Sequence, residues 1–201
     1  MAERIAVIDF ETTGMSPAQG ARPTEIGVAM IEDGRIVARY QSLMNAGVWV
    51  PPFIEQLTGI SNAMLREAPP IAEVMLEAAE FIGDVPLLAH NAAFDSKFWD
   101  AELGLLGRRR GRDFACSLLL SRRLLPQAPS HSLGNLNHWL ALPDTGQAHR
   151  ALVDAEMAAN LCLHLQALLR ERHDIHADHD YLCGLQKLSA AKVRALLKAS
   201  G

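Results

Sequence analysis

The sequence predicts an α/β protein in which a mixed β-sheet is flanked by α-helices. Residues 4–10 form a continuous apolar and β-branched run, as expected of a central strand. Residues 25–31 and 35–43 also have strand patterns, and the Asp33-Gly34 pair between them is typical of a two-residue β-hairpin turn. In the second half of the chain, strand patterns alternate with helical ones, which indicates that helices cover the sheet.

The remaining elements follow from shorter local patterns. Apolar runs predict two further strands, at residues 85–89 and 114–116. Helical periodicity and capping residues predict a series of helices, at residues 51–57, 61–68, 71–82, 92–105, 117–125, 132–140 and 151–170. We expect one domain over residues 1–173 and a C-terminal helical tail of unknown role over residues 174–201.

Composition favours a protein of a reducing compartment, and we expect it to be cytoplasmic. Hydrophobic residues make up 49% of the 201 residues, enough for a sizeable core. The three cysteines form no CxxC pair, which argues against a disulfide framework and a zinc site. We expect no membrane partner, because no signal-peptide pattern opens the chain and no uncharged apolar run reaches membrane-spanning length.

Two carboxylates lie at the end of the first predicted strand, in the segment DFETTG. Side chains alternate along a strand, so Asp9 and Glu11 point to one face while Phe10 points into the core. Neighbouring carboxylates repel each other and are costly to desolvate, and a hard divalent cation removes that cost. The alternative is an acidic strand end that faces water.

Two further segments place acidic residues near helix starts. In HNAAFD, Asn91 is a good N-cap and Asp95 lies in the first turns of the following helix. In HRALVD, His149 precedes a long helix and Asp154 lies about one turn inside it. Taken singly, these acids fit helix-dipole complementation and His149 fits a surface histidine. Taken together with the pair on the strand, they predict a metal site with a nearby base.

The order of these three segments resembles that of the DEDDh 3′→5′ exonucleases, a ribonuclease H-like family that includes the proofreading epsilon subunit of bacterial DNA polymerase III. DFETTG, HNAAFD and HRALVDA are similar to the three motifs of that family. Further similar text is TEIG in the second strand, LTGI after the double proline and SHSL before a short helix. The resemblance covers roughly residues 4 to 170 and implies a ribonuclease H-like fold.

The resemblance also implies a role for each matching residue. The metal ligands would be four carboxylates, those of Asp9, Glu11, Asp95 and Asp154. His149 would be the general base, and its position five residues before Asp154 indicates the histidine branch of the family. Substrate contacts are expected at Thr12, Thr13, Leu57, Asn91 and Arg150, with His90 and Phe94 supporting the site.

The expected activity is removal of nucleotides from a DNA 3′ end by two divalent cations, Mg²⁺ or Mn²⁺, with release of nucleoside 5′-monophosphates. The net charge of −4 is unfavourable for binding nucleic acid, but two divalent cations would cancel it. Single-stranded DNA is the expected substrate, and the C-terminal tail is a candidate contact for a DNA polymerase or clamp. Two alternatives stay open: an exoribonuclease that trims RNA ends, and an inactive scaffold that only binds nucleic acid.

Two other features receive no assigned function from the sequence. Residues 108–112 form a basic cluster that suits either a phosphodiester backbone or a solvated loop. His173, His176 and His179 alternate with acidic residues, but their spacing does not fix one face of a helix. We interpret that tract as an exposed linker.

Overall fold

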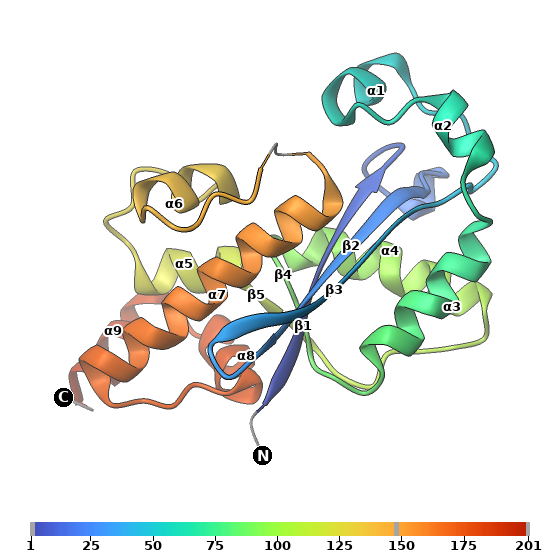
Figure 1. The fold of residues 1–201 in the computed structure, drawn as a ribbon. Helices are drawn as coiled ribbons and strands as arrows, with labels where there is room; N and C mark the ends of the chain where they lie inside the picture. Colours follow the sequence, from blue (N-terminus) through green and yellow to red (C-terminus); the bar gives the residue numbers. More distant parts are fainter. Residues whose placement is uncertain (1–2, 147–148, 200–201) are drawn as a thin grey trace.

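The computed structural model describes residues 3–146 and 149–199, which form a five-stranded mixed sheet with helices on both faces (Figure 1). Its strands are β1 (Arg4–Thr12), β2 (Pro23–Glu32), β3 (Arg35–Leu43), β4 (Leu87–Ala89) and β5 (Phe114–Cys116), in the order β3-β2-β1-β4-β5. The first three strands pair antiparallel, and β4 and β5 add parallel to β1. The predicted mixed α/β sheet is confirmed.

Most helices cover the two faces of the sheet, and α1 and α2 lie beyond the C-terminal end of β1 (Figure 1). They are η1 (Pro17–Gln19), α1 (Pro52–Thr58), α2 (Asn62–Glu67), α3 (Ile71–Ile82), α4 (Ala92–Leu105), α5 (Ser117–Leu124), α6 (Leu133–Trp139), α7 (Ala151–His173), α8 (His179–Lys187) and α9 (Ala190–Ala199). Apolar residues of α3 and α4 form one core with the sheet, and those of α5 to α9 form a second core on the opposite face. The central strand β1 is therefore covered on both sides.

Alternation along β1 decides which side chains reach the site. Ile5 and Val7 belong to the core beneath α7, whereas Ile8 and Phe10 belong to the core beneath α4. Asp9 continues the row of Ile5 and Val7 and therefore lies on the α7 side of the sheet. The strand also runs further than residues 4–10, because β2 pairs with it as far as Thr12.

The C-terminal segment packs against the sheet and the helices that precede it. Leu182 and Leu185 of α8 and Val193 of α9 are buried in the core beneath α7. The side chain of Gln186 bonds the edge of β5 twice, donating to the carbonyl of Phe114 and accepting from the N–H of Cys116. This amide takes the place of a neighbouring strand along β5.

His179 corrects the interpretation of the histidine tract as an exposed linker. It is buried, and its Nε2 lies 2.8 Å from the carbonyl oxygen of Leu87 in β4. Spacing alone missed it because the burial comes from docking of α8 on the sheet. Within residues 3–146 and 149–199, no helix combines the length and apolar character needed to cross a membrane.

Candidate active site

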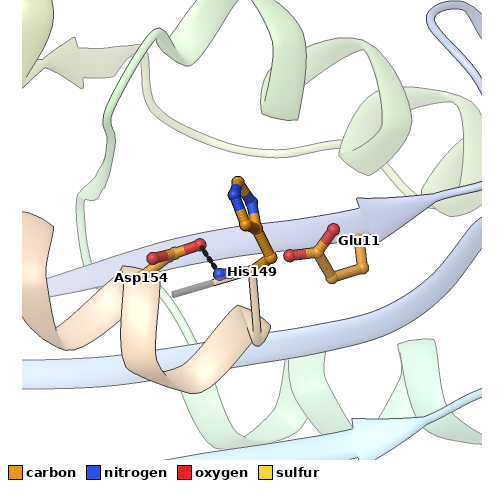
Figure 2. Close-up of side chains that lie close together, drawn as sticks. All are labelled: Glu11, His149 and Asp154. Carbon is orange, nitrogen blue, oxygen red and sulfur yellow. Dashed lines mark hydrogen bonds between the residues drawn. The ribbon is translucent and has the colours of Figure 1, made fainter. Parts of the chain in front are cut away.

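The predicted site residues converge where β1 ends and where α4 and α7 begin (Figure 1). Glu11, His149 and Asp154 each offer one ligand atom, and these atoms all lie within 4.8 Å of one another. Figure 2 shows the imidazole of His149 between the carboxylates of Asp154 and Glu11. Segments almost 140 residues apart in sequence thus supply one cluster of two acids and a histidine.

Asp95, near the start of α4, contacts the end of β1. It is 2% exposed, and its Oδ1 accepts a hydrogen bond of 3.2 Å from the backbone N–H of Phe10. Strand β4 pairs with β1 only at Ala6 and Val7, so Phe10 lies beyond that ladder and its N–H is available. This bond holds the α4 carboxylate against the strand that carries Asp9 and Glu11.

His149 lies in a backbone conformation that turns the chain into α7. Its φ is 65°, in the left-handed region that most side chains avoid. Its N–H donates a hydrogen bond of 3.0 Å to Oδ2 of Asp154, and the N–H of Asp154 bonds the carbonyl of Arg150. The backbone of His149 and the Asp154 carboxylate are consequently tied together at the helix start, and the imidazole is exposed.

The electrostatics of the cluster are those of crowded and desolvated carboxylates. Burial raises the pKa of Asp95 from its ordinary 3.8 to about 7. Burial, together with repulsion from Asp154 and Glu25, raises the pKa of Glu11 from 4.5 to about 8. The pKa of Asp9 is raised well above its usual range by burial and by the nearby Asp95, and burial also raises that of Asp154. Crowded carboxylates of this kind can hold a divalent cation in place of protons, because hard cations prefer oxygen ligands.

The residues expected to contact substrate differ in the hydrogen bonds that they make and in their exposure. The buried hydroxyl of Thr12 donates to the carbonyl of Gly14, and that of Thr13 accepts from the N–H of Arg22, so both hydroxyls brace the loop after β1. Asn91 occupies the N-cap of α4 with a φ of 66°.

Leu57 on α1 is 52% exposed. Arg150 directs its guanidinium to Glu25 through Nε at 3.2 Å and Nη2 at 2.7 Å. The basic loop 108–112 follows the C-terminal end of α4, whereas Asp95 lies near the start of that helix. The Nε of Arg110 in this loop donates a hydrogen bond of 2.8 Å to Oδ1 of Asp100 on α4.

His90 and Phe94 support the site from within the fold. The Nε2 of His90 donates to the carbonyl of His131 at 3.0 Å, which leaves Nδ1 to accept from the hydroxyl of Ser117. Burial lowers the pKa of His90 to about 4, so the ring is neutral. Phe94 packs against Phe98, with ring centroids 5.0 Å apart. Both residues fix the start of α4, where Asp95 lies.

Two residues to which the sequence patterns gave no role, Glu25 and Gly27, hold the start of α7 on β2. Glu25 is fully buried and bonds Arg150 and the backbone N–H of Ala151. A Cβ at Gly27 would lie 2.2 Å from the backbone of Ala151. The sequence signal for both residues is the family-like segment TEIG in the second strand, which does not by itself indicate a contact with α7.

Known proteins share this arrangement of sequence and fold. The profile of the exonuclease family, described as RNase_T exonuclease, matches residues 6–162. The chain belongs to that family. The predicted resemblance to DEDDh exonucleases and the ribonuclease H-like fold are therefore confirmed.

Individual relatives agree with this membership. DNA polymerase III subunit epsilon of Aquifex aeolicus is 33% identical over 159 residues, covering 77% of this chain and 76% of the relative. The 3′-5′ exonuclease DinG of Bacillus subtilis is 36% identical over 173 residues, covering 84% of this chain and 18% of DinG. The chain thus spans less than a fifth of the length of DinG.

Solved structures show the same fold at low sequence identity. Exonuclease X in complex with 5′ overhanging duplex DNA superposes with a TM-score of 0.73 at 23% identity, covering 90% of this chain and 99% of that one. The nuclease domain of 3′hExo, a DEDDh family member bound to rAMP, superposes with a TM-score of 0.69 at 18% identity, covering 82% and 92%. The chain carries an exonuclease domain over most of its length.

Proposed function

We propose that the protein is a metal-dependent 3′→5′ exonuclease that hydrolyses the terminal phosphodiester bond of DNA and releases nucleoside 5′-monophosphates. The observation that carries the proposal is the convergence of Glu11, His149 and Asp154 within 4.8 Å, beside the crowded carboxylates Asp9 and Asp95. These oxygens fit two divalent cations, Mg²⁺ or Mn²⁺, held by Asp9, Glu11, Asp95 and Asp154. When bound, such cations neutralise charge on the attacking and departing oxygens.

His149 would act as the general base in this reaction. The exposed ring lies between two carboxylates, and histidine is the side chain most often used as a general base near neutral pH (Figure 2). The imidazole takes one proton from the attacking water as the water oxygen bonds to phosphorus. The bond from phosphorus to the 3′-oxygen breaks, and that oxygen leaves with the shortened strand and is protonated by solvent.

The substrate side of the proposal rests on residues around the carboxyl end of β1. Thr12, Thr13 and Asn91 would contact the terminal nucleotide through backbone and side chain, and Arg150 would approach the phosphate with the part of its guanidinium that faces away from Glu25. Leu57 would pack against the terminal bases.

Exposed apolar residues near Leu57 favour a single-stranded end. Phe53 is one helical turn before Leu57 and 67% exposed, and Trp49 in the preceding loop is 71% exposed. Helix α1 overhangs the end of β1 (Figure 1). Bases stack on such surfaces with little dependence on sequence, and only unpaired bases offer their faces.

Two broader assignments accompany the proposed activity. A DNA polymerase or clamp is a candidate partner of residues 174–201, since a relative of this chain is named as a subunit of DNA polymerase III. The three cysteines are free and buried, which agrees with a reducing, cytoplasmic location.

One degradation experiment tests polarity, sugar preference and metal requirement together. Single-stranded DNA, duplex DNA and RNA of one sequence carry either a 5′ or a 3′ label and are incubated with Mg²⁺, Mn²⁺ or a chelator. We expect a 3′ label on single-stranded DNA to be released at once as mononucleotide, a 5′ label to give a shortening ladder, and the chelator to abolish both. Faster loss of RNA would assign an exoribonuclease, and binding without cleavage would assign a scaffold.

A further inference from the structure

Glu25 is a fully buried carboxylate with four hydrogen-bond donors. Its Oε1 accepts from Nη2 of Arg150 at 2.7 Å and from Nε2 of Gln41 at 2.7 Å. Its Oε2 accepts from the backbone N–H of Ala151 at 3.0 Å and from Nε of Arg150 at 3.2 Å. Two of the three donor residues, Arg150 and Ala151, form the junction between the loop of His149 and helix α7.

This junction lies directly on β2 and beside the catalytic cluster. Glu25 is the register partner of Glu11 across the β1–β2 pair. Two residues further along β2, Gly27 offers no side chain, and the backbone of Ala151 occupies that space. His149 and Asp154, which flank the junction, can therefore face Glu11 only while Arg150 and Ala151 stay in place.

The position of Glu25 is electrostatically unfavourable for its neighbours. Its charge contributes to the raised pKa values of Asp9, Glu11 and Asp154, so it adds repulsion to a site that is already crowded with acids. The guanidinium of Arg150 offsets that repulsion at Glu11. This ion pair joins the fully buried Glu25 to an Arg150 side chain that is 39% exposed, and removal of either partner leaves the other without its ionic partner.

We propose that Glu25 is a positioning residue, which clamps Arg150 and Ala151 so that Asp154 faces Glu11 in the geometry that binds divalent cations and His149 lies beside them as the base. The inference rests on the proposed metal-dependent site, and it assigns to Glu25 no contact with substrate or with the reacting atoms. Groups that orient metal ligands from behind typically change metal affinity or activity by about 10–100-fold when removed.

Cation binding to the free protein separates positioning from simple charge effects. The Arg150→Met variant removes a positive charge near the site, so electrostatics alone would tighten Mn²⁺ binding. The positioning role predicts the opposite: titration calorimetry should give a dissociation constant of Arg150→Met for Mn²⁺ that is about 10-fold larger than that of wild type. Glu25→Gln should weaken binding to a similar extent, and the double variant should be no weaker than the worse single variant, because both changes release the same clamp.

A matched control comes from another pair that ties α7 to the sheet. Arg39 on β3 pairs with Glu156 on α7, and Arg39→Met should leave the Mn²⁺ dissociation constant and the rate of DNA degradation within about twofold of wild type, as for exposed ion pairs. Thermal unfolding shows whether each variant folds. If Glu25→Gln does not fold, Arg150→Met still tests the proposal, because the side chain of Arg150 is half-exposed.

The possible outcomes separate a failure of the proposed function from a failure of the proposed role of Glu25. Wild-type protein that neither binds Mn²⁺ nor degrades DNA would refute the proposed function. Wild-type protein that does both, with Arg150→Met or Glu25→Gln binding Mn²⁺ as tightly as wild type or more tightly, would refute the role of Glu25 alone.

Discussion

We expect the substitution Gly27→Ala to push α7 away from the sheet, because the added methyl group has no room. A Cβ there would lie 2.2 Å from the carbonyl carbon of Ala151, 2.2 Å from the nitrogen of Leu152 and 2.4 Å from the oxygen of Ala151. Ordinary contact needs about 3.4 Å, so the start of α7 would have to retreat by about 1.2 Å, the difference between 3.4 and 2.2 Å. All three atoms belong to backbone, so no side-chain rotation can relieve the contact.

Gly27→Ala should therefore affect activity more than stability. Forcing an extra methyl group into packed structure typically costs about 1–3 kcal/mol of unfolding free energy. A displacement of about 1 Å in a catalytic group can cost about 100-fold in rate, and the start of α7 carries Asp154 and directly follows the loop of His149. We expect kcat for single-stranded DNA to fall by roughly that factor in the presence of Mn²⁺, while a folded transition persists in thermal unfolding.

Gly104→Ala is the control for the same chemical change. Gly104 lies in α4, and a Cβ there meets no atom within 4 Å. Replacing glycine by alanine in a helix usually stabilises by about 0.5–1 kcal/mol, and we expect unchanged kcat. If Gly27→Ala matched Gly104→Ala in both melting temperature and kcat, direct packing of α7 on β2 would not be what positions the site.

Three further predictions follow from the site. His149→Gln should lower kcat by about 10²–10⁴-fold yet leave the Mn²⁺-induced rise in melting temperature intact, and turnover near wild type would exclude His149 as the base. Without metal, Glu11 and Asp95 have folded pKa values of about 8 and about 7 against ordinary values of 4.5 and 3.8, so the folded state binds more protons and loses stability as pH rises from about 4 to 8. Calorimetric melting should therefore show a larger Mn²⁺ stabilisation at pH 8 than at pH 5, and an equal effect at both would contradict the crowded-carboxylate account. Phe53→Ala should raise KM for single-stranded DNA by about 5–150-fold with little change in kcat, since stacking contributes about 1–3 kcal/mol per base, whereas Leu105→Ala, at a similarly exposed residue of α4, should not.

The members of the candidate cluster could be identified from sequence because they lie in three motifs, at a strand end and at two helix starts. Alternation along β1 puts Asp9 and Glu11 on one face. The structure has the same alternation, since Ile5 and Val7 belong to one core and Ile8 and Phe10 to the other. The burial of Asp95 and the proximity of His149 to Glu11 required the fold, because they depend on where α4 and α7 begin relative to the end of β1.

The supporting contacts could not be predicted because they join residues that are distant in sequence through a single hydrogen bond or a close approach. Glu25 and Arg150 are 125 residues apart, and neither residue type indicates the other. Gln186 on α8 completes the edge of β5, and nothing in the tail's pattern of leucines specifies that contact. Local patterns determine which elements form, whereas these pairs depend on how the elements pack.

We infer that Asp9, Glu11, Asp95 and Asp154 together bind divalent cations while His149 stays free to accept a proton. Anomalous diffraction from crystals soaked in Mn²⁺ measures this directly. We expect manganese peaks coordinated by these carboxylates, with the imidazole of His149 outside the coordination sphere. Peaks absent from this cluster, or a manganese ion coordinated by His149, would contradict it.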